Sequence, residues 1–435
     1  MKNRKINIIT LGCSKNIVDS EKLLRQISYG GYEVLHDSDE TAVDTVIINT
    51  CGFINDAKEE SIDTILRYIR ARNAGIINNL YVIGCLSERY RDELASEIPE
   101  VDRYFGVNDM DSILRQLGIN YNKSLVTERE LTTPGHYAFL KVSEGCDRTC
   151  AFCAIPIIRG KCRSRSMEEI IAEATALAGK GVRELILIAQ DLTYYGLDLY
   201  LENMLPILLQ ELLKIKDFEW IRLQYLYPAN FPAELIPVIR DNPRICSYFD
   251  MPIQHITDNM LKLMKRSHDR SETESVLYRI REEIPRAVIR TTIIAGHPGE
   301  TEKDFNELVD FISGFRFDRL GVFAYSHEED TYAWKNYSDN IPDEVKTLRV
   351  DKLMRIQQDI SYTLNQSLVG TNLKVIIDRR EGDYYIGRSE YDSPEVDHEI
   401  LIPAKFKLET GAFYNIEITS AEEFDLFGIP CTKAL

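Results

Sequence analysis

What this sequence lacks excludes several classes of protein. No uninterrupted apolar run reaches about 20 residues, the length that a membrane-spanning helix needs, so no membrane partner is expected. The N-terminus, MKNRKINIITLGCSKN, has neither the long apolar core nor the small-residue cleavage site of a secretory signal. Basic residues number 52 against 69 acidic ones, and the net charge of −17 argues against a surface that is basic throughout. The sequence therefore predicts a cytoplasmic protein.

Cysteine, in contrast, is frequent for a protein of that compartment. Disulfides are disfavoured in the cytoplasm, so metal binding or catalysis is the leading explanation for clustered cysteines. A lone cysteine is more often a small buried hydrophobic residue, and we expect Cys162, Cys246 and Cys431 to be of this kind. The complete set is Cys13, Cys51, Cys85, Cys146, Cys150, Cys153, Cys162, Cys246 and Cys431.

The 435 residues divide into three parts. In residues 1–119, strand-like runs alternate with helix-forming sequence, which predicts a Rossmann-like parallel α/β domain. Residues 136–368 contain six more strand–helix repeats, which predict a partial (β/α)6 barrel of the TIM type. Residues 371–435 consist of short strand-like runs between turns, typical of a small all-β barrel. The polar stretch 120–136 is expected to be a linker.

Local patterns in the second part support this division. Ser166 and Thr301 are expected to cap helices, because each precedes a helix-period apolar face. The six expected strands of the partial barrel are 138–142, 184–189, 220–226, 248–253, 288–295 and 320–325.

The sharpest local signal is the spacing C-x3-C-x2-C of Cys146, Cys150 and Cys153, directly after the first strand of the second part. In a β/α barrel this is the end where active sites form. Three thiolates on one short loop suit a cubane iron–sulfur cluster and leave one iron open for chemistry. A redox dithiol formed by Cys150 and Cys153, or a structural zinc site, is the competing interpretation.

This spacing, with Phe152 before the third cysteine, resembles that of the radical S-adenosylmethionine enzymes. The resemblance implies that the open iron chelates S-adenosylmethionine and that one electron cleaves the cofactor to a radical. We expect five residues in the S-adenosylmethionine pocket, from that resemblance or from their place at strand ends on the same face. They are Phe152, Gln190, Asp191, Gly296 and Gly299.

The cysteines of the first part are not close in sequence, but their placement is alike. Cys13, Cys51 and Cys85 each follow a strand-like run, so each lies at the C-terminal end of an expected parallel strand. These ends share one edge of a sheet, where α/β proteins bind ligands, and neighbouring strands are about 4.8 Å apart. The pattern predicts a second three-thiolate site.

With both cysteine sets, the whole chain resembles the methylthiotransferases. The resemblance implies an auxiliary [4Fe–4S] cluster on Cys13, Cys51 and Cys85, and a radical [4Fe–4S] cluster on the other three cysteines. It also implies a substrate-binding C-terminal barrel of the TRAM type, an electron donor and a sulfur donor. In this family a radical opens a C–H bond of the target and a methylthio group is inserted.

The charge of the last part favours one branch of the family. Residues 372–435 contain 13 acidic and 7 basic residues, which suits a basic protein better than tRNA. The acidic stretch 387–397 and the segment 251–255 resemble the RimO-type branch, whose target is an aspartate side chain of ribosomal protein S-twelve of the small subunit. A tRNA adenosine methylthiotransferase of the MiaB type, or a non-catalytic iron–sulfur or zinc protein, is the alternative. We expect His255 and His297 to be structural.

Overall fold

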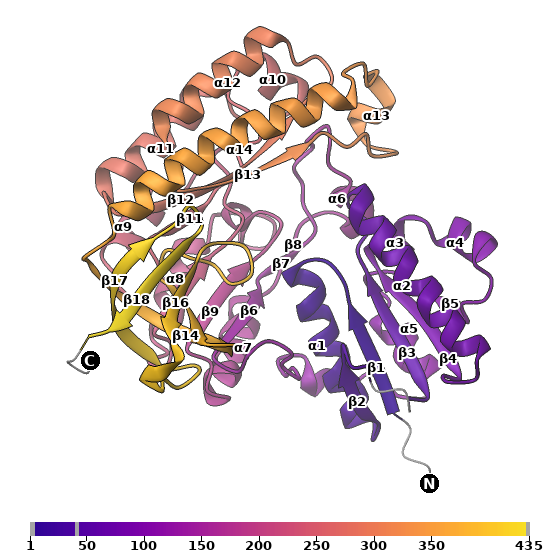
Figure 1. Cartoon of the computed structure of the whole chain (residues 1–435). Coiled ribbons are helices and arrows are strands. Elements are labelled where there is room, and N and C mark those ends of the chain that lie inside the picture. The colour runs from indigo at the N-terminus through magenta and orange to yellow at the C-terminus, as the bar shows by residue number, and fades with distance from the viewer. Residues whose placement is uncertain (1–4, 40–42, 432–435) are drawn as a thin grey trace.

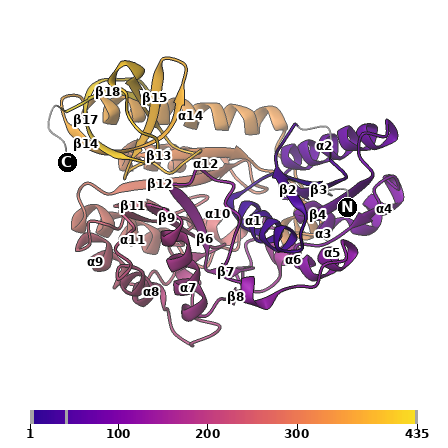
Figure 2. The same cartoon turned by 90° about the horizontal axis from the view of Figure 1, so that it is seen from below.

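A computed structural model describes residues 5–39 and 43–431. A central domain lies between the N-terminal α/β domain and the small C-terminal barrel (Figure 1). The view from below shows these two outer parts on different sides of the central domain (Figure 2). None of the helices within the described ranges is long and apolar enough to cross a membrane.

The N-terminal domain is a five-stranded parallel sheet in the order β2-β1-β3-β4-β5, as its alternating pattern predicted. Helices cover both faces because successive side chains of a strand point to opposite sides. Ile47 packs on the α1 side of the sheet and Ile48 on the α2 side. The elements are β1 (Lys5–Thr10), α1 (Ser14–Tyr29), β2 (Glu33–His36), β3 (Thr45–Thr50), α2 (Asn55–Asn73), β4 (Asn79–Gly84), α3 (Cys85–Arg89), α4 (Arg91–Glu97), β5 (Arg103–Tyr104) and α5 (Met110–Gln116).

The central domain contains all six predicted strands as an open parallel barrel. They form two three-stranded sheets, β6-β9-β10 and β11-β12-β13, joined by a parallel bridge between Ile221 and Ile245. The strands are β6 (Tyr137–Lys141), β9 (Glu184–Ile188), β10 (Trp220–Leu223), β11 (Tyr248–Asp250), β12 (Val288–Ala295) and β13 (Arg319–Ala324), with a small hairpin of β7 (Ser143–Glu144) and β8 (Arg163–Ser164).

The helices of the central domain follow the strands. Ser166 and Thr301 cap two of them through their side-chain oxygens, as predicted. The helices are α6 (Ile155–Arg159), α7 (Met167–Gly179), α8 (Leu205–Leu212), α9 (Leu235–Arg240), α10 (Asp258–Leu263), α11 (Arg270–Glu283), α12 (Glu302–Phe315), α13 (Tyr332–Asn336) and α14 (Asp343–Gln366), with 3-10 turns at η1 (Lys123–Leu125) and η2 (Leu192–Tyr194).

The N-terminal domain is anchored firmly to the central domain. Val18 of α1 packs with Phe139 and Ile188 of the barrel. The expected linker is also anchored, because Arg129 is buried and forms ion pairs with Glu21 of α1 and Glu173 of α7. The two domains therefore share an interface that is part apolar core and part buried charge.

The C-terminal domain is a closed five-stranded barrel in the order β14-β15-β16-β18-β17. It covers the N-terminal ends of the central strands, where Ile376 packs with Trp220 and Tyr248. Helix α14 also contacts it, because the Asn365 side chain donates to the carbonyl of Glu422 at 3.0 Å. The elements are β14 (Asn372–Glu381), β15 (Tyr384–Ser389), β16 (Glu399–Pro403), η3 (Ala404–Phe406), β17 (Phe413–Ala421) and β18 (Asp425–Pro430).

Candidate functional site

The structure places Cys13, Cys51 and Cys85 as the sequence predicted. They follow the C-terminal ends of β1, β3 and β4, which are neighbours in the sheet. Cys13 precedes the first turn of α1, and Cys85 begins α3. Three thiols from distant parts of the chain therefore share one edge of the sheet.

The loops that carry these thiols pack tightly on one another. A Cβ atom at Gly12 would lie 2.8 Å from Cβ and 3.0 Å from Sγ of Cys51. A Cβ atom at Gly52 would lie 2.6 Å from the backbone of Leu86, the residue after Cys85. Both glycines therefore permit close approach between the cysteine loops, a local requirement that a larger side chain would not meet.

Burial favours the neutral thiol at Cys51 and Cys85. Burial raises the pKa of the Cys51 thiol and raises the pKa of Cys85 to about 12, and the neighbouring cysteines add to both shifts. Iron binds the thiolate, so cluster binding has to displace these protons.

The second triplet lines a cavity of about 260 Å³ at the mouth of the central barrel. Burial raises the pKa of the Cys146 thiol to about 11 and also raises that of Cys153. The sulfur atoms accept hydrogen bonds: Cys146 Sγ from the backbone N–H of Arg148 at 3.4 Å, and Cys150 Sγ from Arg266 Nη1 at 3.3 Å. Donors aimed at sulfur stabilise a thiolate, which fits a ligand role.

The donors of both triplets are thiols, the ligands that iron–sulfur clusters use. Among residues 5–39 and 43–431, no three His, Cys, Asp or Glu side chains converge closely enough to hold one ion. Structural zinc requires such convergence, whereas each thiolate of a cubane cluster binds a different iron.

The predicted S-adenosylmethionine pocket is only partly assembled by the structure. Phe152, Gln190 and Asp191 line the same cavity as the second triplet. Gly296 and Gly299 are absent from that lining. A Cβ atom at either glycine would instead meet the side chain of Lys346 or Leu263, at 2.4 and 2.7 Å. Their role in the structure is the tight turn before α12, since both have positive φ.

Several residues of this cavity were missed by the sequence reasoning. Arg148 forms an ion pair with Asp191 at 2.9 Å. The aromatic ring of Tyr227 lies 4.1 Å from the guanidinium groups of both Arg148 and Arg266. Arg148 lies within the C-x3-C loop and could have been found there, whereas Arg266 and Tyr227 carry no sequence signal.

Gln254 is the missed residue with the strongest structural indication of a ligand. It has a positive φ of 70°, and its buried Oε1 atom has no hydrogen-bond partner in the described structure. It lines the 260 Å³ cavity and also an adjoining cavity of about 610 Å³. Backbone strain and an unpaired polar atom are both unfavourable, and they gather at functional sites.

The larger cavity lies between the N-terminal and central domains. Phe53, two residues after Cys51, lines both cavities together with Phe152 and Thr292. Phe323 of β13 also lines the larger cavity, and its side chain is 53% exposed. The cavity lined by Cys146, Cys150 and Cys153 therefore shares lining residues with a larger one that Phe53, from the loop after Cys51, also lines.

Residues next to one cysteine triplet also pack directly against a cysteine of the other. Cys85 packs with Ala154 and Ile158, and Ala154 directly follows Cys153. Helix α6 thus begins beside one triplet and ends beside the other.

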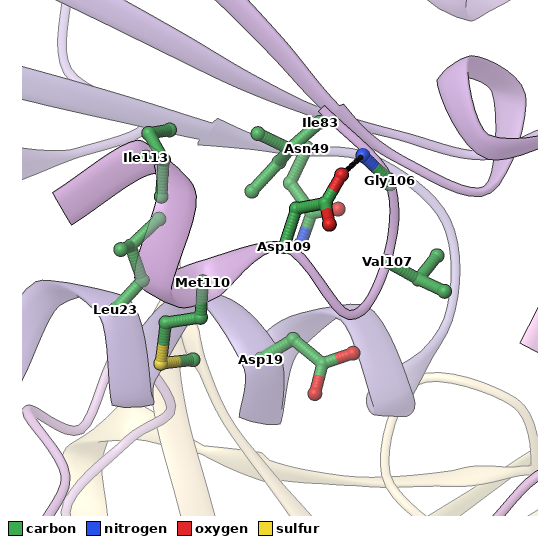
Figure 3. A pocket seen from close by; sticks show the side chains of 10 residues that line it. Asp19, Leu23, Asn49, Ile83, Gly106, Val107, Asp109, Met110 and Ile113 are labelled. Atoms are coloured by element: carbon green, nitrogen blue, oxygen red, sulfur yellow. Dashed lines mark hydrogen bonds between the residues drawn. The ribbon is translucent and has the colours of Figure 1, made fainter. Parts of the chain in front are cut away.

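Figure 3 shows a separate and much smaller cavity of the N-terminal domain, of about 20 Å³. That is room for about one water molecule. Asp109 lines it and accepts a hydrogen bond from the backbone N–H of Gly106 at 2.8 Å. None of the six candidate ligand cysteines lines it, although Gly84, the residue before Cys85, does.

His255 and His297 are both buried. His255 Nδ1 accepts from the backbone N–H of Thr257 at 3.2 Å. The ring of His297 stacks edge-on to Tyr325, with centroids 4.9 Å apart, and burial lowers its pKa to about 4. Neither histidine lines the two cavities at the barrel mouth. The Nε2 atom of each is buried without a hydrogen-bond partner among the described residues, and a structural role for both stays a prediction.

Two carboxylates of the acidic stretch 387–397 are buried against the central domain. Asp392 forms a buried ion pair with Arg319 at 2.6 Å, and the buried Asp397 carboxylate accepts from Tyr248 at 2.6 Å. These contacts lie at the N-terminal ends of the barrel strands, opposite the cysteines. Because both side chains are buried, Asp392 and Asp397 do not add their charge to an exposed acidic surface of the C-terminal barrel.

The other three cysteines have the surroundings of structural residues. Cys162 and Cys246 are buried, and Cys246 packs with Trp220 and Tyr248. Cys431 Sγ lies 3.2 Å from Asn372 Oδ1.

Known proteins match each part of the chain. Residues 5–106 match the uncharacterized protein family UPF0004, residues 140–312 the radical SAM superfamily and residues 369–430 the TRAM domain. Among solved structures, the radical S-adenosylmethionine methyltransferase TsrM from Kitasatospora setae has a TM-score of 0.52 at 13% identity, over 74% of this chain and 75% of that one. At this identity the likeness shows the shared fold alone.

The most informative relatives match from end to end. The ribosomal protein uS12 methylthiotransferase RimO of Bacteroides thetaiotaomicron is 54% identical over 428 residues, covering 98% of both chains. The protein of the same name from Porphyromonas gingivalis is 52% identical, over 98% of this chain and 99% of the relative. The RimO-type resemblance is confirmed, and the family and the radical SAM match imply S-adenosylmethionine and [4Fe–4S] clusters as cofactors. The chain belongs to the RimO family of ribosomal protein uS12 methylthiotransferases.

Proposed function

We propose that this chain inserts a methylthio group at the β carbon of an aspartate side chain of ribosomal protein uS12. The family supports the activity and the partner. The observation that carries the proposal is the pair of cysteine triplets that meet across α6, with Cys85 packed on Ala154 beside Cys153. A reaction that needs both a radical and a sulfur-bearing centre requires two such sites next to one substrate space.

The roles of the ligands follow from the cavities. Cys13, Cys51 and Cys85 would hold the auxiliary [4Fe–4S] cluster, and Cys146, Cys150 and Cys153 the radical cluster. When bound, the radical cluster supplies the electron that cleaves S-adenosylmethionine, and the auxiliary cluster supplies the place from which sulfur is delivered.

In this proposal the chain's own side chains bind the ligands of the two cavities and shield them from water. Phe152 and Phe53 line both cavities and exclude water from them. The Arg148–Asp191 ion pair fixes two charged side chains in the radical cavity. Gln254 offers an unpaired acceptor to a ligand N–H or O–H group, which fits it for positioning the cofactor or the target segment.

The partners beyond uS12 follow from the chemistry. The reaction needs an electron donor and a sulfur donor, and we assign this chain to the cytoplasm, where ribosomal proteins are found. We divide the chain into an auxiliary-cluster domain (1–119), a radical domain (136–368) and a TRAM-type barrel (371–435), in agreement with the three matched segments.

An anaerobic assay that offers uS12 and tRNA together tests the proposal. Reconstituted protein with S-adenosylmethionine, sulfide and a reductant should add a methylthio group to an aspartate of uS12, as detected by mass spectrometry of its peptides. A variant with Ala at Cys13, Cys51 and Cys85 should still cleave S-adenosylmethionine but leave uS12 unmodified. Modification of tRNA with no gain on uS12 would contradict the proposal.

A further inference from the structure

Arg159 extends from the central domain to the auxiliary cysteine edge. Its side chain is 1% exposed. Its Nη2 atom donates to Cys85 Sγ at 3.5 Å and to Asn16 Oδ1 at 2.6 Å. A guanidinium group of one domain thus contacts a proposed cluster ligand of the other.

The opposite edge of the guanidinium is paired with carboxylates. Arg159 Nη1 donates to Glu144 Oε1 at 2.8 Å and to Asp19 Oδ2 at 3.2 Å. Lys141 forms ion pairs with the same two carboxylates. Two cations and two anions therefore surround one point of the domain interface, with the Arg159 Nη2 atom directed toward sulfur.

The backbone fixes this arrangement. Arg159 ends α6, whose first residue comes two positions after Cys153. Ala154 and Ile158 pack on Cys85 and close the same contact with apolar atoms. The guanidinium is planar and permanently charged, so the positive charge of Arg159 itself does not change with pH.

We propose that Arg159 is a positioning residue that orients Cys85 and sets the reduction potential of the auxiliary cluster. The inference rests on the proposed assignment of that cluster. Hydrogen bonds to ligand sulfur and the net charge nearby are the protein's means of tuning such clusters. A reduced cluster carries one more negative charge, so a buried cation at its ligand stabilises the reduced form and raises the potential.

Full-length protein with Ala at Cys146, Cys150 and Cys153 allows the auxiliary cluster to be measured alone. Its potential is read by redox titration with electron paramagnetic resonance, without substrate. Arg159→Met should lower the potential, shifting the ratio of reduced to oxidised cluster about tenfold at fixed solution potential, or about 59 mV for a one-electron couple. Arg159→Lys keeps the charge and should give a smaller shift.

Two further variants separate tuning from simple loss of structure. Glu144→Gln leaves the Arg159 charge less compensated and should shift the potential in the opposite, positive direction. Arg266→Met, in the same background, removes a cation whose wild-type sulfur contact is to Cys150 of the other triplet, and should leave the auxiliary cluster's potential unchanged. If Arg159→Met does not retain iron, the potentials of Arg159→Lys and Glu144→Gln still test whether the charge at Arg159 sets the potential of the cluster.

Unchanged potentials in the Arg159 and Glu144 variants at full iron content would overturn the inference, and so would shifts of the same sign in Arg159→Met and Glu144→Gln. Failure of the proposed function has a different signature. In that case wild-type protein would lack the auxiliary cluster, or would carry it without modifying uS12.

Discussion

Replacing Gln254 by Met should make the ligand-free protein more stable and its ligand binding weaker. The two side chains are similar in length, but Met has no strong acceptor. The Gln254 Oε1 atom is buried without a hydrogen-bond partner in the described residues. The native residue therefore has an unfavourable environment until a ligand donates to it.

The expected magnitudes follow from that single atom. A buried unsatisfied acceptor costs about 1–3 kcal/mol of folding free energy. Removing about 1 kcal/mol of that cost should raise Tm by about 2–4 °C for a domain of about 150–250 residues. Losing one hydrogen bond of about 1.4 kcal/mol to the ligand should raise the KM for S-adenosylmethionine or for uS12 about tenfold.

Anaerobic thermal melts of metal-free protein and KM measurements for both substrates provide the assay. Gln224→Met is the matched control, because Gln224 Nε2 already donates to Ser393 Oγ at 2.5 Å. That substitution should lower Tm. The reasoning fails if Gln254→Met lowers Tm as Gln224→Met does, or if both KM values remain those of the wild type.

Three further predictions concern the clusters, the barrel contact and pH. Replacing Cys146, Cys150 and Cys153 by Ala should halve the iron content, from about eight to about four atoms per chain. A colorimetric iron assay measures this, and an unchanged iron content would refute the ligand assignment. Arg319→Met leaves Asp392 buried without its ion-pair partner, so the free energy of unfolding should fall by about 3–5 kcal/mol. Urea titration measures this, and an unchanged midpoint would show that the pair does not stabilise the fold. Burial lowers the pKa of His398 to about 3, so the folded state stays unprotonated where the unfolded state binds a proton below about pH 6.5. The free energy of unfolding should then fall as pH decreases from about 6.5 toward 3, by up to about 1.4 kcal/mol per pH unit. Urea titrations at several pH values should show a shallower slope for His398→Gln, and equal slopes in both proteins would contradict this prediction.

The strands and helix caps were predictable because their signals are local. Strand 288–295 could be read from its apolar residues, and Thr301 from its place before an amphipathic helix. Strand β5, only two residues long, and β18 had no comparable pattern and were not predicted. Gly296 and Gly299 were expected in the pocket because a strand-to-helix turn can bind anions, but the side chains of Lys346 and Leu263 occupy the space beside them.

The sequence by itself determined the chemistry. Six cysteines, three on one short loop and three that each follow a strand-like run, predict two sulfur-rich sites, because ligand type and spacing can be read from the chain. Only the tertiary structure decided which charges face which partners. Asp392, one of the acidic residues of the C-terminal part, is buried against Arg319, and Arg159 bonds to Cys85, 74 positions away. Hydrogen bonds and ion pairs act over a few ångströms of space, and sequence separation does not reveal that distance.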